Sequence, residues 1–136
     1  MNKTFAYYIA VLYKDFIDYS TSEFKALGFN FGQFPFILYV GKHPNCTQAK
    51  LTSSLHLDWG HSSRTITKLV ENGFMTKELV DNKNYCLSLT DKGYKAFKLT
   101  HDVFESWDQQ HLSSLSEEER TTLLLLNEKV LETKSN

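Results

Sequence analysis

The chain has 136 residues, of which 41% are hydrophobic and 23% are charged, and its formal net charge is −1. This composition is typical of one ordinary globular domain and excludes a disordered chain. No apolar run approaches the ~18 residues of a transmembrane helix, and the N-terminus lacks a signal-peptide pattern, so we expect a cytoplasmic protein with no membrane partner. Because the net charge is near zero, any nucleic-acid binding has to come from a local arrangement of side chains.

The cysteine and histidine patterns favour neither a metal centre nor catalysis. Cys46 and Cys86 are too few for a disulfide framework or a cysteine-rich zinc site. The histidines are His43, His56, His61, His101 and His111. None of them forms a pair four residues apart on a helix. Because no nucleophile motif, phosphate-binding glycine loop or metalloprotease motif is present either, we expect no enzyme activity, no metal and no cofactor.

The N-terminal third predicts two helices. Large apolar residues recur at a helical spacing over residues 4–27, which indicates one long amphipathic helix that stops near Gly28. A short buried helix is expected next, within residues 31–45. Pro35 suits its first turn, and Gly41 closes the segment together with a following proline.

Residues 47–73 predict two helices joined by a short turn. Thr47 is a good cap for a helix over residues 48–55, and the tripeptide HLD then forms the turn. The second helix runs to Gly73, a strong C-terminal signal. Two helices with so short a connection are typical of a helix-turn-helix.

The periodicity then changes from helical to extended. Residues 74–80 and 85–89 suit two strands, and the DNKN sequence between them is good turn chemistry. A β-hairpin therefore follows the helix-turn-helix directly. The expected fold class is mainly α with a small β-hairpin (α+β).

Two further helices complete the predicted fold. Thr90 caps a long helix over residues 91–112. Ser116 and Glu119 form a capping box that opens the last helix, which is expected to end near Leu131.

The second helix of the helix-turn-helix has two chemically different sides. Ile66, Leu69 and Val70 fall on one side, with Ser62 beside them. The opposite side carries His61, Arg64, Thr67 and Lys68, with Ser63 at its margin. This polar side is too rich in donors to belong to a core.

The donors on this polar side are those that reach phosphates and base edges. Arg can fork onto guanine, and Ser and Thr bond to several bases. The alternative interpretation is a solvated amphipathic helix, but that alternative does not explain why Glu71 is the only acid between Trp59 and Gly73. We therefore favour contact with DNA.

The same region resembles the winged helix-turn-helix core of the MarR family of bacterial transcription regulators. The resemblance rests on Thr47 and Gln48 at the start of the first helix, and on Arg64 in the second. It continues with Gly73 and with the LSLTDKG sequence that closes the wing. An apolar spine in the first helix also matches (Leu51, Leu55 and Leu57). The flanking helices correspond too, so the resemblance covers nearly the whole chain.

The resemblance implies a domain plan and a function. It implies a single MarR-type domain over residues 1–136, with dimerisation helices at residues 1–30 and 112–136. Between them lie a winged helix-turn-helix core at residues 31–92 and a long linking helix at residues 91–111. The implied function is a transcription regulator, usually a repressor, that binds a pseudo-palindromic operator in double-stranded DNA as a homodimer. Such regulators often release the operator when a small molecule binds.

The predicted DNA contacts combine the polar helix side with the family's positions. They are Thr47, Gln48, His61, Ser62, Ser63, Arg64, Thr67, Lys68 and Lys83. The family's wing usually carries Asp-x-Arg at its tip, where this chain has Asp81, Asn82 and Lys83, and the wing looks shorter than usual. We therefore hypothesise that the recognition helix is the principal reader, so that Lys83→Ala costs less affinity than Arg64→Ala.

Aromatic side chains crowd the N-terminal third, and two interpretations stay open. The resemblance implies a pocket between the first two helices and the helix after the wing, which would suit a small aromatic or lipophilic ligand. Its predicted lining is Tyr8, Leu12, Phe16, Phe34 and Tyr39. Alternatively, these aromatics fill the core of the dimer.

Two alternatives concern the thiols and the function class. Cys46 is the better candidate for a redox-active thiol, because Lys42 and His43 lie close to it, although an inert thiol is expected. The rival function is a winged-helix protein-interaction module without DNA contact. The near-neutral charge and short wing favour that rival, whereas Arg64 and Lys68 count against it.

Overall fold

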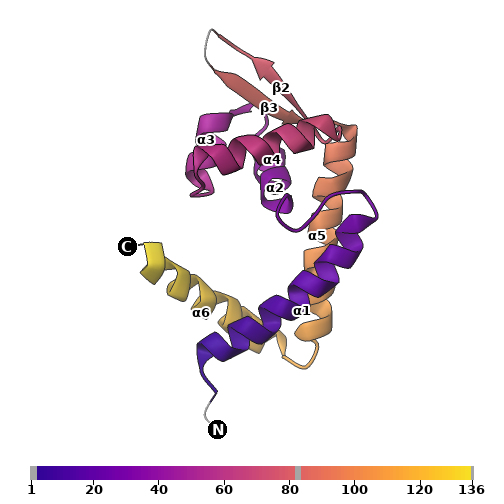
Figure 1. Ribbon diagram of the computed structural model, residues 1–136. Helices are drawn as coiled ribbons and strands as arrows, with labels where there is room; N and C mark the ends of the chain where they lie inside the picture. Colours follow the sequence, from indigo (N-terminus) through magenta and orange to yellow (C-terminus); the bar gives the residue numbers. More distant parts are fainter. Residues whose placement is uncertain (1–2, 82–83, 136) are drawn as a thin grey trace. The chain divides into compact units, whose positions relative to one another are not determined.

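The computed structural model describes residues 3–81 and 84–135. It is mostly helical, with one small three-stranded antiparallel sheet, as the sequence predicts for the fold class (Figure 1). The chain divides after Val103 into two compact units, and each is described by itself. Among the described residues, no helix combines the length and the apolar character that crossing a membrane requires.

Helix α1 spans Phe5–Lys25 and keeps most of its surface in solvent. The Thr4 hydroxyl caps it by accepting a hydrogen bond from the Tyr7 backbone N–H at 3.1 Å. Only Ser20 and Phe24 are buried. The helix ends at Lys25, slightly before the predicted stop, because the turn that follows reaches Gly28 at a left-handed φ of 87°.

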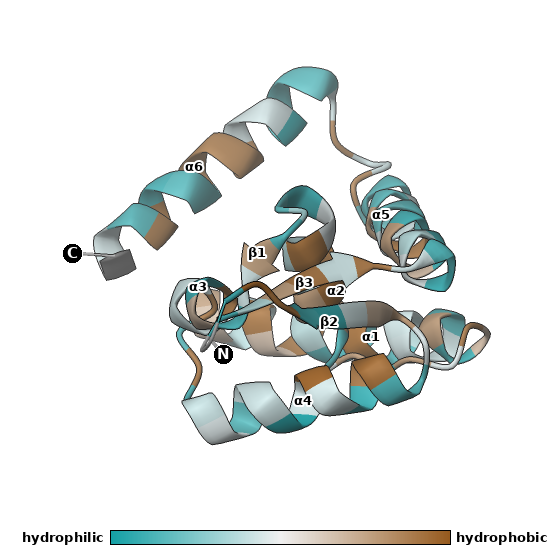
Figure 2. Ribbon diagram, turned by 90° about the horizontal axis from the view of Figure 1, so that it is seen from above, coloured by the Kyte–Doolittle hydropathy of each residue, from teal (hydrophilic) through white to brown (hydrophobic). Residues whose placement is uncertain are grey.

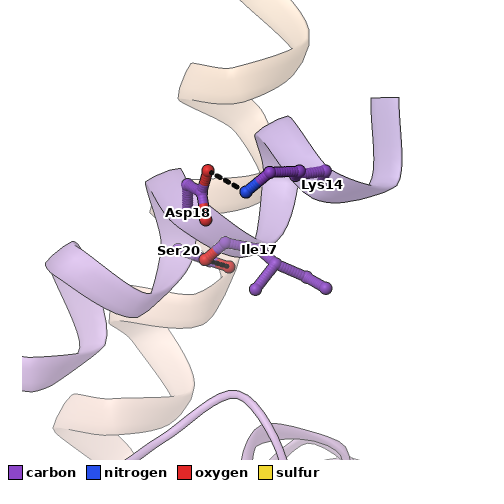
Figure 3. A network of polar contacts seen from close by, with 4 residues as sticks. All are labelled: Lys14, Ile17, Asp18 and Ser20. Carbon is purple, nitrogen blue, oxygen red and sulfur yellow. Dashed lines mark hydrogen bonds and ion pairs between the residues drawn. The ribbon is translucent and has the colours of Figure 1, made fainter. Parts of the chain in front are cut away.

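Figure 3 shows the polar contacts along the middle of α1. Lys14 and Asp18, one helical turn apart, form an ion pair at 3.2 Å. Both side chains are exposed, so this pair contributes only about 0.3–0.5 kcal/mol. The buried Ser20 hydroxyl donates to the Phe16 carbonyl at 2.6 Å, which satisfies it within its own helix.

Helix α2, Phe34–Lys42, lies within the predicted range and carries Pro35 in its first turn. It buries Phe36, Ile37 and Val40. Gly41 allows α2 to approach helix α5 (Asp91–His111) closely, because a Cβ at position 41 would overlap the Phe97 ring.

Helices α3 (Gln48–Ser54) and α4 (Trp59–Glu71) form the predicted helix-turn-helix. Thr47 caps α3, as predicted, by accepting from the Lys50 N–H at 3.1 Å. Asp58 caps α4 by accepting from the His61 N–H at 2.8 Å. These two caps fix where the turn ends, and so they fix which α4 residues face outward.

The sheet contains one strand more than the sequence predicted. Strands β2 (Met75–Leu79) and β3 (Tyr85–Leu89) form the expected hairpin, and β1 (Cys46–Thr47) pairs with the other edge of β3. The hairpin pairs Lys77 with Leu87 and Leu79 with Tyr85. A two-residue strand is too short to show alternating hydrophobicity, which is why β1 was not predicted.

Helix α5 spans Asp91–His111 and starts at the predicted Thr90 cap, which accepts from the Gly93 N–H at 3.1 Å. Gly93 lies against the start of the sheet, because a Cβ there would overlap the Phe74 carbonyl oxygen. The core of the first unit gathers from α1 to α5. Its fully buried apolar side chains include Phe24, Phe36, Ile37, Val40, Leu51, Ile66, Leu69, Phe74, Leu87 and Ala96.

The second unit contains the end of α5 and helix α6, Glu117–Ser135. The predicted capping box is confirmed: the Ser116 N–H donates to the Glu119 carboxylate at 2.9 Å, and the Glu119 N–H donates to the Ser116 hydroxyl at 3.1 Å. The prediction of an end near Leu131 was wrong, because α6 continues to Ser135. Figure 2 shows hydrophobic turns alternating with hydrophilic ones along α6.

Candidate nucleic-acid interface

Helix α4 presents the two sides that its sequence predicts. Ile66 and Leu69 have no exposed surface and anchor the helix to the core. The opposite side is in solvent, with His61, Arg64, Thr67 and Lys68 exposed and Ser63 half-buried. Figure 2 shows this helix as predominantly white and teal, the colours of intermediate and hydrophilic residues. The helix therefore offers a polar surface on a rigidly packed element.

Two predicted DNA contacts have to be corrected. Ser62 has no exposed surface, and its hydroxyl lies 2.6 Å from the Thr52 hydroxyl. Thr52 itself donates to the Gln48 carbonyl at 2.7 Å, which leaves Ser62 to donate to Thr52. Gln48 is only 3% exposed and offers almost no surface. The Ser62 hydroxyl therefore links α4 to α3 rather than facing a ligand, and Gln48 is too buried to be a major contact.

The cations on the polar side of α4 are free to bind. Within the described residues, Arg64 and Lys68 make no ion pair or hydrogen bond with protein side chains. The Arg64 guanidinium lies over the first turn of α4, where a Cβ at Gly60 would come within 3.2 Å of its Nη1 atom. A larger residue at position 60 would therefore crowd this side chain.

The two threonines of this helix have less donor capacity than their composition suggested. Thr67 donates its hydroxyl proton to the Ser63 carbonyl at 2.8 Å, and Thr65 donates to the His61 carbonyl at 3.0 Å. Each hydroxyl has one proton, so both are left as acceptors. Thr67 therefore offers a DNA partner an acceptor and a methyl group.

A depression of about 310 Å³ flanks α4 on one side. Its lining includes Asn30 and Gln33 from the loop before α2, and His61, Arg64 and Lys68 from α4. None of its lining residues is acidic. Sequence reasoning did not single out the two amide residues, because nothing along the chain shows which loop lies against the helix.

A second depression, of about 200 Å³, lies between the start of α4 and the sheet. We call it the wing cleft; its lining residues are Thr47, Gln48, Ala49, Trp59, Ser63, Lys77, Asn84 and Tyr85. Sequence reasoning missed Trp59, Lys77 and Tyr85. The period-two pattern places the last two on one face of the hairpin, but only the fold brings this face beside α4.

The tip of the wing is described only in part. Asp81 and Asn84 close the turn, since the Asn84 N–H and side-chain amide donate to the two Asp81 carboxylate oxygens at 3.1 and 3.0 Å. Lys83, the predicted contact at the tip, lies outside the described residues. Its role stays a prediction.

The five residues predicted to line an effector pocket lie on α1 and α2, in different surroundings. Tyr8 and Leu12 are 49% and 42% exposed on α1. Phe16 and Phe34 each contact the Phe31 ring, with centroids 5.8 and 4.9 Å apart. Tyr8, Leu12 and Phe16 follow one another at intervals of four residues and so share one side of α1, and their role in an effector pocket stays a prediction.

Tyr39 has other neighbours than Phe16 and Phe34. Its hydroxyl lies 3.2 Å from that of Ser54 in α3, and its ring stacks on His43 with centroids 4.2 Å apart. Positions 34 and 39 lie on different sides of a helix, so Tyr39 cannot join the Phe31 cluster.

The thiol considered for redox chemistry is also unsuited to it. Burial raises the pKa of the Cys46 thiol from 9.0 to about 11. A redox-sensing cysteine needs a lowered pKa, so the expected inert thiol agrees with the structure. No group of three or more potential metal ligands comes together in the described ranges.

Known proteins resemble the chain over the segment that contains this interface. The model of the MarR family matches residues 31–79, which hold α2, α3, α4 and β2. An HTH-type transcriptional regulator, BilQ, from Clostridium symbiosum (strain WAL-14163) is 38% identical over 136 residues, covering 98% of this chain and 94% of the relative.

Solved structures share the fold over nearly the full length. A MarR transcriptional regulator from Methanosarcina mazei Go1 superposes with a TM-score of 0.86 at 27% identity, covering 98% of this chain and 92% of that one. A MarR-type regulator from Listeria monocytogenes, solved with a 26mer DNA, gives 0.83 at 28% identity over 97% and 89% of the two chains. The present chain therefore belongs to the MarR family of transcriptional regulators.

Proposed function

We propose that this regulator binds double-stranded DNA sequence-specifically through the polar side of α4. The observation that carries the proposal is that Arg64 and Lys68 have no partner among the described residues, on a helix that buries Ile66 and Leu69 on its other side. A rigid helix with free donors on one side is what major-groove readout requires. The Listeria relative solved with DNA supports the same role.

We further propose that the chain acts as a homodimer. Large apolar side chains of both terminal helices stay 38–65% exposed within one chain. On α1 they are Phe5, Tyr7, Tyr8, Ile9, Val11, Leu12 and Tyr13, and on α6 they are Leu123, Leu124, Leu125, Leu126, Val130 and Leu131. Such surfaces mark protein interfaces, and a second copy of the chain is the partner that the family resemblance implies.

A two-fold symmetric dimer predicts the form of the operator. Its two α4 helices would enter successive major grooves ~34 Å apart, so the half-sites should form an inverted repeat with centres one helical turn apart. Occupying such a site in a promoter would repress transcription. If a small aromatic or lipophilic effector releases the DNA, the exposed aromatic side chains of α1 are the surface that suits it chemically.

The alternative function is a winged-helix module that binds a protein instead of DNA. It is favoured by the net charge of −1 and by Leu79 and Val80, which are 56% and 63% exposed at the end of β2. These side chains would suit an apolar partner. The alternative leaves the free cations of α4 without a role.

A fluorescence-anisotropy titration separates the two functions. The probe is duplex DNA from the region upstream of the protein's own gene, measured against a scrambled duplex. If the protein binds DNA, affinity should fall at least tenfold between about 50 and 200 mM salt, because released counterions drive phosphate binding. Binding that is absent at both salt concentrations would support the protein-interaction module.

A further inference from the structure

One face of the sheet packs in the core at one end and forms a wall of the wing cleft at the other end. Met75, Leu87 and Leu89 on this face are buried against the helices. Further toward the tip, the same face carries Lys77 and Tyr85, because side chains alternate along each strand. Figure 1 shows the hairpin extending beyond α3 and α4 at this end of the molecule. This face of the sheet is therefore buried near Met75 and lines the cleft beside the start of α4.

Large aromatic side chains flank the cleft. Trp59, in the first turn of α4, is 56% exposed, and Tyr85, on β3, is 40% exposed. The Lys77 ammonium lies 4.4 Å from the centre of the Tyr85 ring, a cation–π contact that holds its side chain across the strands. The cation is thus positioned at the cleft, and no carboxylate in the described part of the chain pairs with it.

The polar groups of the cleft are mainly unused donors. The Ser63 hydroxyl, the Trp59 indole N–H and the Tyr85 hydroxyl make no hydrogen bond within the described residues. The Thr47 hydroxyl accepts from the Lys50 N–H, so its own proton is still available. No lining residue is acidic: Glu78 points to the other face of β2, and the Asp81 carboxylate accepts from the lining residue Asn84. This donor set, with one lysine, is complementary to an anion.

A DNA phosphate is the anion whose position fits. When α4 lies in the major groove, the sugar-phosphate strand that borders the groove runs beside that helix. The cleft is lined by Trp59 and Ser63 of α4 and by Lys77 and Tyr85 of the hairpin. A phosphate there would meet Lys77 and the free hydroxyls, and the deoxyribose could pack on the aromatic rings.

We propose that the wing cleft holds one backbone phosphate of the bound DNA, with Lys77 as its charged contact and Ser63, Trp59 and Tyr85 as neutral contacts. The inference rests on the proposed function and adds to it residues that position the protein on the strand. A phosphate contact carries no sequence information, so the cleft sets register and affinity while α4 reads the bases.

The test compares salt dependence among matched variants. Anisotropy titrations over a range of salt use Lys77→Gln and, as a control with the same charge change, Lys98→Gln on the exposed surface of α5. Lys77→Gln should weaken binding by a similar factor on the upstream and scrambled duplexes, and should lower the slope of log K against log salt by about 0.9 per protomer. Lys98→Gln should leave the slope unchanged.

A second pair of variants addresses the neutral contacts. Tyr85→Phe removes only a hydroxyl and should weaken binding without changing the slope. Tyr94→Phe, at a similarly exposed tyrosine of α5, should change neither. Replacing single phosphates of the upstream duplex by neutral methylphosphonates then locates the contact. One position per half-site should weaken wild-type binding but have no further effect on Lys77→Gln.

The outcomes separate a failure of the proposed DNA binding from a failure of the proposed phosphate contact. If the wild-type protein binds neither duplex, the proposed function fails. If it binds with the expected salt dependence but Lys77→Gln keeps the full slope, the cleft does not hold a phosphate and only this inference is overturned. If Lys77→Gln does not fold, as judged by circular dichroism, Tyr85→Phe and the methylphosphonate scan on the wild type decide instead.

Discussion

Helices α4 and α6 expose opposite chemistries. Helix α4 buries Ile66 and Leu69 completely and exposes cations and hydroxyls, whereas α6 exposes Leu125 and Leu131 at 62% and 65%. A single chain therefore satisfies the apolar side of α4 and leaves that of α6 in water. This difference indicates two surfaces with different partners, since donors suit nucleic acid and leucines suit another protein.

The largest expected effect tests whether Leu69 of α4 and Leu125 of α6 contribute differently to the stability of the folded chain. Leu69→Ala should lower the free energy of unfolding by about 2–5 kcal/mol, because it leaves a cavity in a closed core. Leu125→Ala should cost within about 0.5 kcal/mol at low protein concentration, because its side chain is already exposed. Urea unfolding measures both variants. Equal losses at low concentration would contradict the comparison.

The second effect concerns the apolar face of α6. Leu125→Asp should weaken self-association at least tenfold, because a charge at a protein interface loses its water without gaining a partner. Sedimentation velocity over a concentration series measures the dimer fraction. Val80→Asp, at a similarly exposed apolar residue of the wing, is the control and should leave the dimer intact. A dimer that persists in Leu125→Asp would remove α6 from the interface.

The third effect compares the recognition helix with the tip of the wing. Arg64→Ala should cost about 1–3 kcal/mol of binding free energy on the upstream duplex, as expected for loss of a forked base contact. Lys83→Ala should cost less, because a lysine at the tip is a point charge in place of the family's usual arginine. Anisotropy titration at one salt concentration gives both values. A loss for Lys83→Ala that equals or exceeds that for Arg64→Ala would overturn this ranking.

The smallest effect is the pH dependence from Cys46. Its pKa is about 11 in the fold and 9.0 when exposed, so the unfolded chain releases the thiol proton first as the pH rises. The stabilisation is fully present below pH 9 and is lost as the pH rises toward 11. Urea unfolding at pH 7.5 and at pH 10 should show a smaller alkaline loss for Cys46→Ser than for wild type. Identical losses would contradict the burial of this thiol.

Local patterns predicted the helices and the hairpin well. The helical spacing of apolar residues and the caps Thr47, Thr90 and Ser116 depend on neighbours within one turn, so one sequence shows them. The same holds for the two sides of α4, whose exposed and buried residues follow the helical period. The family itself was recognised from these features.

The errors lie where distant segments meet. Ser62 and Gln48 were assigned to the DNA surface, but both are buried, and Ser62 contacts Thr52 of α3. The wing cleft joins Trp59 to Lys77 and Tyr85, three residues on three elements that no local pattern connects. The lining of the effector pocket stays a prediction.

The central claim is that the polar side of α4 distinguishes DNA sequences. The most direct test is the ratio of affinities for the upstream and scrambled duplexes, measured by anisotropy for wild type, Arg64→Ala and the control Lys98→Ala. We predict that wild type and Lys98→Ala keep the same ratio and that Arg64→Ala lowers it by about tenfold or more. An unchanged ratio in Arg64→Ala, with the upstream duplex still preferred, would contradict the account.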